Sequence, residues 1–206
     1  MKKLPILIIA IACIAIEVNA QSTDHREDPQ FGLKIGTNYS NVYDSEGEEF
    51  EADGKFGLAT GVFMTIPIGK FIGIQPEVLY SRKGFKGTGS IQGLSYDIIR
   101  TTSYIDIPLM FSVKPTPAIS LVAGPQYSFL LKQKDEYGSL VQEQEFENDN
   151  IRKNTMAFIG GIDFNFNDCV IGTRVGWDMV NNHGDGTSST PRYKNVWYQL
   201  TFGFRF

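Results

Sequence analysis

The sequence predicts an all-β fold, a closed eight-stranded antiparallel β-barrel of the up-and-down type that spans a membrane. Three observations lead to this prediction. Apolar and polar residues alternate with a period of two along most of the chain. Short and long connections alternate between these segments, and the face opposite the apolar one carries charges of both signs. The 206 residues are enough for one domain of ordinary size.

The first residues indicate export and form no part of the expected barrel. Lys2 and Lys3 precede an apolar run over 4–16, and 18–20 places small residues before a plausible cleavage point. This is the layout of a secretory signal peptide, and the run is too short for a membrane-spanning helix. We therefore expect a cleaved signal peptide at 1–20, a flexible polar lead-in at 21–29, and an outer membrane β-barrel domain at 30–206.

An alternative reading makes Cys13 the lipidation site of a lipoprotein signal. The apolar run continues past Cys13, and Ala10 is a poor match for the branched residue usual in such signals, so the cleaved peptide is favoured. Beyond this segment Cys169 has no second cysteine with which to form a disulfide. The net charge of −4 argues against nucleic acid as a partner.

Eight segments alternate clearly enough to be predicted as strands. Each is about long enough to cross a bilayer at a tilt. The predicted strands cover 31–39, 56–66, 72–81, 104–113, 120–129, 156–165, 171–179 and 196–206. Short links are expected at 67–70, 115–117 and 166–168, and long polar links at 41–54, 84–95, 132–154 and 181–194. Short periplasmic turns and long extracellular loops are typical of a transmembrane barrel.

Three prolines fall inside predicted strands, at Pro76, Pro108 and Pro125. Each removes a backbone donor from a ladder. Counted from the nearest short turn, they lie at similar heights on neighbouring strands. We therefore expect a local bulge or a loosened patch at this place in the wall.

The charged residues of the polar face decide which way the sheet faces. In a membrane the apolar side must meet lipid, so charges must lie inside, where partners of opposite sign lower the cost of burial. An eight-stranded barrel is filled by its side chains and has no open pore. The predicted lumen network consists of Lys34, Glu77, Arg100, Asp106, Asp163, Arg174, Asp178 and Arg205.

Aromatic residues cluster near both ends of the predicted strands. Two such girdles are expected where a barrel meets the two membrane interfaces. Tyr39, Tyr80, Tyr127, Trp177, Trp197 and Tyr198 lie toward the long links, and Phe31, Phe71, Phe166 and Phe206 toward the short turns. The last predicted strand has the pattern read by the barrel assembly machinery, which we assign to Tyr198, Leu200, Phe202, Phe204 and Phe206.

Several motifs along the chain resemble those of the PorT-type outer membrane β-barrel proteins. The resemblance spans nearly all of the chain after the expected signal peptide. It rests on the residues at 32–36 with Asn38 and Ser40, on Gln75-Pro76-Glu77-Val78-Leu79-Tyr80-Ser81-Arg82-Lys83-Gly84, on Tyr104-Ile105-Asp106-Ile107-Pro108-Leu109, on Gly124-Pro125 and on the closing Phe204-Arg205-Phe206. It implies an outer membrane location and, because the family's namesake is linked to protein secretion, a role in the envelope.

The sequence gives little reason to expect catalysis, a metal or a cofactor. His25 lies in the lead-in, while His183, Asp185 and Ser188 share one glycine-rich link with no strand to orient them. No zinc spacing is present, and no calcium loop unites Asp149, Asp178 and Asp185. The acidic segments 44–53 and 135–149 are predicted to be solvated outer loops, with cation-mediated contact to lipopolysaccharide or partner docking as the alternative.

The predicted protein is therefore a non-enzymatic integral outer membrane barrel with a filled lumen. Its role would be structural, partner-binding or associated with the envelope and secretion, through the outer loops. The expected partners are outer membrane lipids and lipopolysaccharide, the barrel assembly machinery during biogenesis, and an envelope protein. Two alternatives stay open: a small outer membrane enzyme that modifies lipids, and a soluble periplasmic barrel that binds a ligand.

Overall fold

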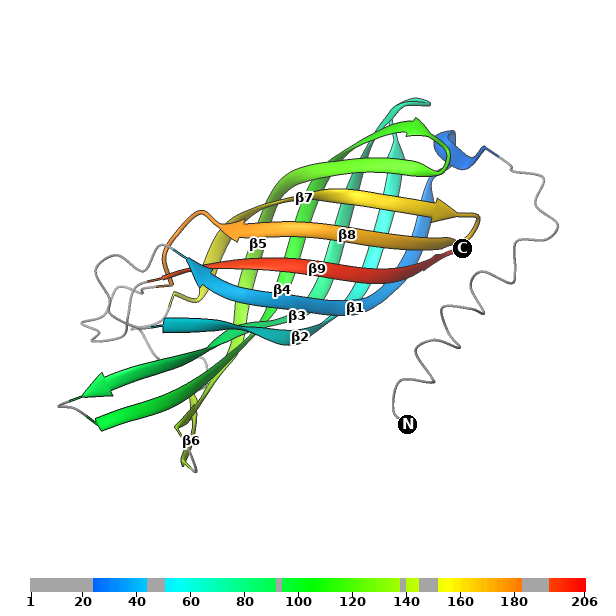
Figure 1. Cartoon of the computed structure of the whole chain (residues 1–206). Helices are drawn as coiled ribbons and strands as arrows, with labels where there is room; N and C mark the ends of the chain where they lie inside the picture. Colours follow the sequence, from blue (N-terminus) through cyan, green and yellow to red (C-terminus); the bar gives the residue numbers. More distant parts are fainter. Residues whose placement is uncertain (1–23, 44–50, 92–93, 138–139, 145–151, 183–192) are drawn as a thin grey trace, which may run out of the picture.

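The computed structural model describes residues 24–43, 51–91, 94–137, 140–144, 152–182 and 193–206 (Figure 1). The expected signal peptide lies outside the described residues. In the described part, no helix is long and apolar enough to cross a membrane. The elements are η2 (His25–Glu27), β1 (Gln30–Tyr43), β2 (Glu51–Pro67), β3 (Ile72–Ile91), β4 (Leu94–Thr116), β5 (Ile119–Tyr137), β6 (Leu140–Gln144), β7 (Asn154–Phe166), β8 (Cys169–Asp178) and β9 (Lys194–Arg205).

Eight of these strands close into one antiparallel barrel, which confirms the predicted fold class. The strand order is β4-β3-β2-β1-β9-β8-β7-β5, and β5 pairs back onto β4. The first and last strands join through β1 and β9, where Thr37 pairs with Leu200. Closure leaves no row of unpaired backbone groups in the wall, which is the condition for placing a sheet in hydrocarbon.

The connections differ sharply between the two ends of the barrel. At one end, which we call the short-turn end, β2–β3, β4–β5 and β7–β8 are joined by 68–71, 117–118 and 167–168. Asn167, in the last of these turns, has a φ of +49°, a left-handed conformation that asparagine tolerates better than most residues. These three turns agree with the predicted short links to within about two residues.

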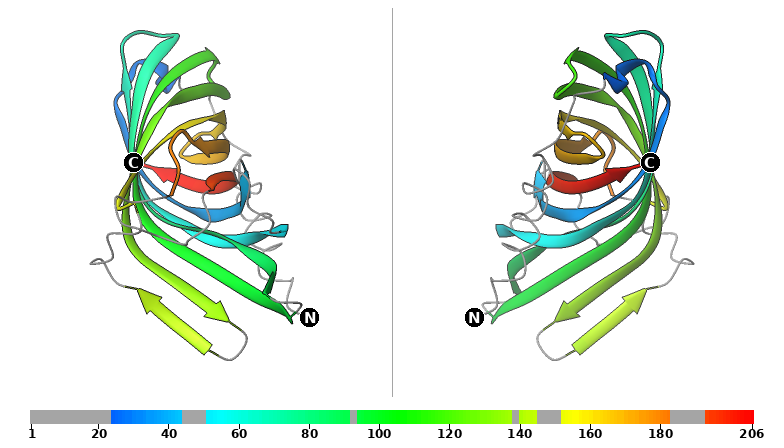
Figure 2. Two further views of the ribbon diagram at one scale, coloured as in Figure 1. Left: turned by 90° about the vertical axis from the view of Figure 1, so that its left-hand side faces the viewer. Right: turned by 90° about the vertical axis from the view of Figure 1, so that its right-hand side faces the viewer.

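The opposite end contains more strand than the sequence predicts. The predicted links at 84–95 and 132–154 are wrong as irregular loops, because β3 and β4 stay paired up to Ile91↔Leu94 and β5 pairs with the additional strand β6. The two hairpins leave the barrel wall together (Figures 1 and 2). A hairpin beyond the bilayer has no lipid to face, so its strands carry no apolar alternation although their backbones still pair.

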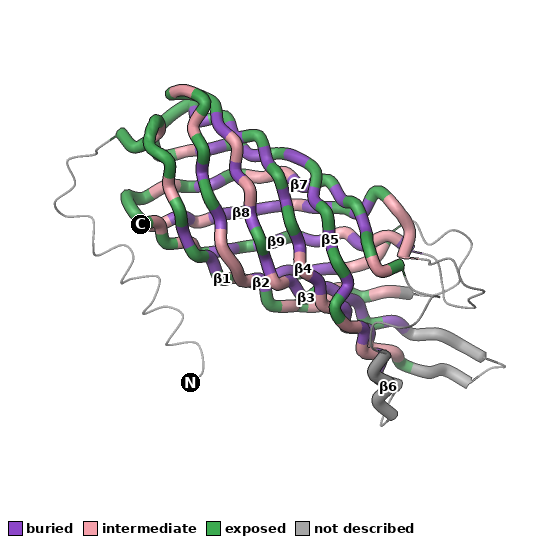
Figure 3. The backbone as a smooth tube through the Cα atoms, turned by 180° about the vertical axis from the view of Figure 1, so that it is seen from behind, coloured by how far each residue is buried: buried purple, intermediate pink, exposed green. Residues whose placement is uncertain are grey.

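The apolar side chains face outward along the whole wall. Leu200 and Phe202 expose 42% and 40% of their surface, while their neighbours Gln199 and Thr201 are buried. Figure 3 shows the same alternation of buried and exposed positions on the other strands. An outward apolar face contradicts the soluble ligand-binding barrel, in which these side chains would line the interior.

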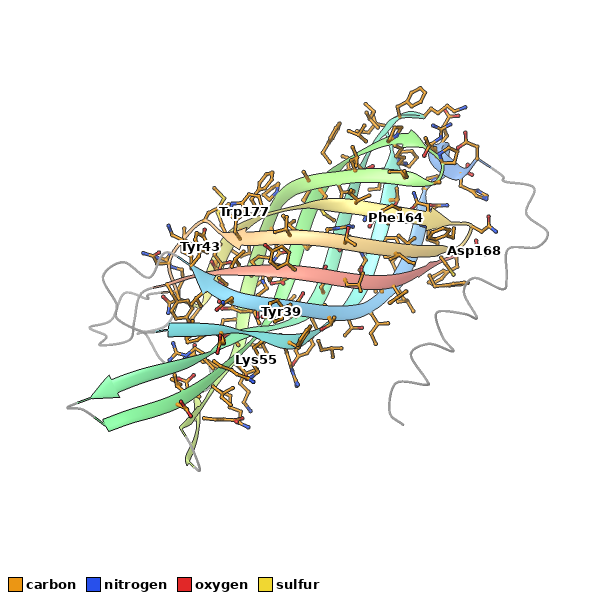
Figure 4. All side chains as sticks on the ribbon, in the orientation of Figure 1. Tyr39, Tyr43, Lys55, Phe164, Asp168 and Trp177 are labelled. Carbon is orange, nitrogen blue, oxygen red and sulfur yellow. The ribbon has the colours of Figure 1, made fainter. Side chains whose placement is uncertain are left out.

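The aromatic girdles are present with one correction. Tyr39, Tyr43 and Trp177 lie on the outer surface near the end opposite the short turns (Figure 4). Phe31, Phe71, Phe166 and Phe206 are exposed near the short turns. Trp197, predicted to belong to the first girdle, is fully buried because its place in the alternation points it inward. A Cβ on the neighbouring Gly176 would lie 2.3 Å from the Trp197 ring, so this glycine makes room for it.

The three prolines interrupt three adjacent ladders. Pairing stops between Phe63↔Glu77 and Ile66↔Ile74, between Pro76↔Leu109 and Leu79↔Asp106, and between Pro108↔Gln126 and Phe111↔Ala123. The register is the same on both sides of each gap. The pairing is therefore interrupted at the expected place, and the alternative of a bulge at these positions is wrong.

We expect the backbone amides beside these gaps to exchange with solvent faster than those of an unbroken ladder. A lost backbone hydrogen bond removes about 1 kcal/mol, or about fivefold in local opening. Hydrogen exchange measured by NMR in detergent micelles would compare 64–65, 77–78 and 109–110 with 171–173 on β8. Equal protection at the two sets would show that the interrupted pairing does not loosen the wall.

Candidate functional site: the polar interior of the barrel

The structure directs all eight residues of the predicted lumen network into the barrel. Their strands alternate, so each faces the interior opposite a lipid-facing neighbour. Seven of them are at most 6% exposed, and Arg205, at the short-turn end, is partly buried. They do not form one cluster but divide into groups at different heights, which we call the inner, middle and outer clusters.

The inner cluster consists of Lys34, Gln75, Glu77, Asp163 and Arg174 and crosses the lumen from β1 to β8. The Nζ of Lys34 lies 2.5 Å from Glu77 Oε1. Gln75 Nε2 donates to Glu77 Oε1 at 2.9 Å and to Asp163 Oδ2 at 3.1 Å. Arg174 Nη2 lies 2.7 Å from Asp163 Oδ1 and 3.9 Å from Glu77 Oε1. Two cations and two carboxylates therefore balance, joined by one amide.

The middle cluster is built around Lys83. Its Nζ lies 3.0 Å from Asp106 Oδ2 and 3.7 Å from the centre of the Trp197 ring. A cation over an indole face is stabilised by the ring's quadrupole, and more strongly where water is excluded. Asp178, nearby, accepts from Asn195 Nδ2 at 2.6 Å. The fully buried Trp197 thus joins the middle cluster as the aromatic partner of Lys83.

The outer cluster joins β4 to β5. Arg100 donates through Nε and Nη2 to the two oxygens of Asp135, each at 2.8 Å. Gln133 donates to the same carboxylate at 3.2 Å, and Tyr193 OH lies 3.3 Å from Arg100 Nη1. A bidentate guanidinium–carboxylate pair fixes geometry as well as charge. This cluster lies toward the end opposite the short turns.

Three buried charged residues are missing from the predicted network: Lys83, Lys114 and Asp135. Lys83 follows Glu77 and Ser81 at spacing two, so a longer predicted strand would have found it. Asp135 was predicted to lie in a solvated loop, and that prediction is wrong. A register shift opposite Ser103/Tyr104 adds Leu131 to β5 and reverses the faces beyond it, so Gln133 and Asp135 turn inward.

At the short-turn end, part of the predicted lead-in contacts the barrel mouth. η2 is held by reciprocal bonds: Lys114 Nζ donates to Arg26 O at 2.9 Å, and Arg26 Nη1 to Lys114 O at 3.4 Å. Asp24 binds Arg26 at 2.7 Å and Lys70 at 3.3 Å. Its hydrogen bond with Arg26 holds the pKa of the Asp24 carboxyl well below its ordinary value, so the pair stays charged at neutral pH. A cavity of about 290 Å³ lies beside this turn.

Replacing Asp24 by asparagine should loosen this segment. The neutral amide loses the charge-assisted bonds to Arg26 and Lys70, so residues 24–29 should exchange their amide hydrogens several-fold faster. Hydrogen–deuterium exchange with mass spectrometry would measure the peptide directly. Asp28→Asn is the matched control, since Asp28 binds His25 within the same turn. Equal acceleration in both variants would mean that Asp24 does not anchor the segment.

The residues considered for catalysis or metal binding are not brought together in the described chain. His25 Nδ1 lies 3.0 Å from Asp28 Oδ2, on the exposed turn outside the barrel. His183, Asp185, Ser188 and Asp149 lie outside the described residues, and Asp178 is bonded to Asn195. Within the described residues, no group of three histidine, cysteine or acidic side chains is placed to hold a metal ion.

The closed wall, its outward apolar face and its charged interior define a β-barrel protein of the outer membrane type. The model of a family described as outer membrane protein beta-barrel domain matches residues 19–184. The chain therefore belongs to this family. A search of curated proteins found no match.

Solved structures with this architecture share little sequence with the chain. Neisserial surface protein A (NspA) superposes with a TM-score of 0.54 at 11% identity, covering 85% of this chain and 97% of that one. Ail of Yersinia pestis gives a TM-score of 0.46 at 16% identity, covering 86% and 98%. OprG of Pseudomonas aeruginosa gives 0.43 at 13% identity, covering 86% and 95%. At these identities the likeness concerns the fold.

Proposed function

We propose that this protein is a non-enzymatic outer membrane barrel whose working surface is the pair of hairpins projecting from the extracellular end. The observation that carries this proposal is the length of β3 and β4, which have 20 and 23 residues. Crossing a bilayer takes about 9–11 residues, and β8 spans only 10. About half of each long strand is therefore not needed for spanning.

Backbone pairing makes this projection a preformed surface. β3 and β4 remain in register from the wall to Ile91↔Leu94, and β5 continues beside them to pair with β6. Binding residues placed on a rigid scaffold lose little conformational entropy when a partner docks. Four strands extending together are thus suited to holding an envelope protein or another surface ligand.

The charged interior supports a filled lumen rather than a solute pathway. Each cluster reaches across the lumen through one contact, Gln75–Asp163, Lys83–Trp197 or Arg100–Tyr193, and the ion pairs of the clusters are between 1% and 7% exposed. Opening a path would separate buried partners, which is costly in a low dielectric. Reconstituted in a planar bilayer, the protein should show no conductance of porin size, and a large steady conductance would refute the filled lumen.

Site-specific photocrosslinking in intact cells tests the working surface. A benzophenone amino acid at position 86, exposed on the extension, should capture a discrete protein partner, while the same probe at position 69, in a short turn, should not capture that species. Capture of the same species from both positions, or of none from position 86 and neighbouring extension positions, would contradict a partner-binding role for the hairpins.

A PorT-type, secretion-associated role is the finer form of this proposal. It is supported by the motifs at 75–84 and 104–109, which lie side by side in β3 and β4. These motifs supply Glu77, Lys83 and Asp106 to the interior and lead directly into the projecting hairpin. Deletion of the gene with measurement of secreted protein would test it. Unchanged secretion would contradict the secretion-associated role and would not affect the proposal that the hairpins bind a partner.

A further inference from the structure

A basic groove lies on the outer face of the barrel where the long hairpins leave the wall. It encloses about 670 Å³ and is formed by β1, β2, β3, β4 and β5. Its lining includes four basic side chains of this face, Lys55, Arg82, Lys132 and Lys134, together with the inward-facing Lys83, and Glu136 is the one carboxylate that the described residues contribute. We call this feature the outer groove. Its Lys55 is labelled in Figure 4, close to the point where β3 diverges from β2.

Two cations of the outer groove, Lys55 and Arg82, bind neutral groups. The carboxylate of Glu136 is paired with Lys134, whose Nζ lies 2.8 Å from Glu136 Oε1. Lys55 Nζ donates to the hydroxyl of Thr101, a neutral partner. Arg82 Nε donates to Tyr80 OH at 2.9 Å, and the guanidinium lies 5.7 Å from the centre of that ring. Lys55 and Arg82 therefore bring positive charge to the groove, and Arg82 is held in a fixed orientation by a neutral group.

Apolar side chains continue the outer groove toward the membrane. Phe56 and Leu58 line it and expose 70% and 40% of their surface. The Phe56 ring packs on Tyr39 with centroids 4.9 Å apart. The outer groove therefore presents charge at one level and an apolar wall immediately below it.

The height of the outer groove matches the headgroup region of a bilayer. Tyr80, Tyr127 and Phe129 face outward at the level where aromatic residues mark the interface. Arg82 is the next outward position beyond Tyr80 on β3, and it pairs with Ser103 of β4, as Lys132 of β5 does. Arg82 therefore lies about one residue pair, or roughly 7 Å, farther from the membrane centre than Tyr80.

We propose that the outer groove binds the phosphorylated headgroup of a lipid in the outer leaflet, with an acyl chain lying against Phe56 and Leu58. Guanidinium and ammonium groups are the usual partners of phosphate, and arginine contacts it through parallel hydrogen bonds. Phosphate at an interface is what a membrane lipid offers at this height. The inference rests on the outer membrane location and is independent of whether the hairpins bind a protein.

Titration of the purified full-length barrel with lipid A, a bisphosphorylated glycolipid, tests the proposal. Native mass spectrometry in a neutral detergent would report the bound fraction. The double variant Lys55→Gln/Arg82→Gln should bind about 30-fold more weakly, because each cation near an anionic lipid surface contributes about fivefold. Arg26→Gln/Lys70→Gln removes the same two kinds of charge at the opposite end of the barrel, where both residues contact Asp24, and should bind within about twofold of the parent.

A variant that is expected to bind lipid A more tightly makes the test independent of folding, because a folding defect would only weaken binding. Glu136→Gln removes a carboxylate that repels phosphate, so it should bind lipid A several-fold more tightly. Equal affinities of the two double variants, or equal binding of the uncharged-headgroup lipid diacylglycerol, would overturn the proposal. Displacement of lipid A by millimolar inorganic polyphosphate in the parent would identify the outer groove as a site for soluble polyanions and would also overturn it.

Discussion

Replacing Leu200 by arginine should lower the free energy of unfolding of the bilayer-embedded barrel by about 2–4 kcal/mol, the cost of an arginine on the lipid face near the midplane. Leu200 is 42% exposed on the outer wall of β9, midway between Tyr198 and Phe202 on that face. Its strand neighbours on both sides, Thr37 and Thr173, are fixed by the ladder and leave the side chain no route inward. Urea unfolding in phospholipid vesicles would measure the loss.

Two control variants separate the effect of the position of the charge in the bilayer from the effect of losing the leucine side chain. Leu200→Ala removes the same apolar contacts without adding charge and should cost much less than arginine. Tyr198→Arg places the charge on the same face nearer the interface, where the cost of arginine falls to about 0–1 kcal/mol apart from the loss of the ring. If Leu200→Arg is no more destabilising than Leu200→Ala, Leu200 does not face hydrocarbon.

Replacing Arg174 by methionine should destabilise the barrel by about 3–5 kcal/mol, because one partner of a buried ion pair is removed and the other is left behind. Asp163 would lose its cation at 2.7 Å, and Glu77 would keep only Lys34. Two carboxylates would then face one cation in the inner cluster. Unfolding in urea, followed by the shift of the folded band in gels run without boiling, would measure the effect.

Comparison with an exposed pair shows whether burial is the cause. Lys134→Met breaks an ion pair of similar length whose members are each 35% exposed, and should cost less than about 1 kcal/mol. The double variant Arg174→Met/Asp163→Asn should recover part of the loss, since it restores the balance of charge. An Arg174→Met variant as stable as Lys134→Met would mean that the inner cluster fills space without stabilising the wall.

The interior could be predicted in outline but not in detail. Alternation placed Lys34, Glu77 and Arg174 on one face, yet it could not show which would meet, because Lys34 and Glu77 are 43 residues apart and come together only through the register of two ladders. A single extra residue on β5 decided the place of Asp135. The inward position of Trp197 followed from alternation, but its aromatic character favoured the girdle instead.

The outer groove and the projecting hairpins depend still more on three-dimensional arrangement. Lys55 lies where the β2–β3 register shifts between Gly54 and Ala59, and no period in the sequence marks that shift. The groove's other cations come from β3 and β5, which the barrel's curvature brings to the same face. Beyond the bilayer, the strands of the hairpins are held by backbone pairing, and backbone pairing leaves no apolar signature.

The sequence by itself determined the membrane barrel: the number of wall strands, the short turns, the outward apolar face and the proline patch. It could do so because hydrocarbon accepts only apolar side chains and fully paired backbone. In a membrane-spanning strand this requirement places an apolar residue at every second position, so it can be recognised in the sequence. Only the tertiary structure decided which charges pair, where the wall shifts register, and what stands above the membrane. Those features depend on the register between neighbouring strands. The register is set by the closed sheet as a whole and cannot be predicted from the sequence of one strand.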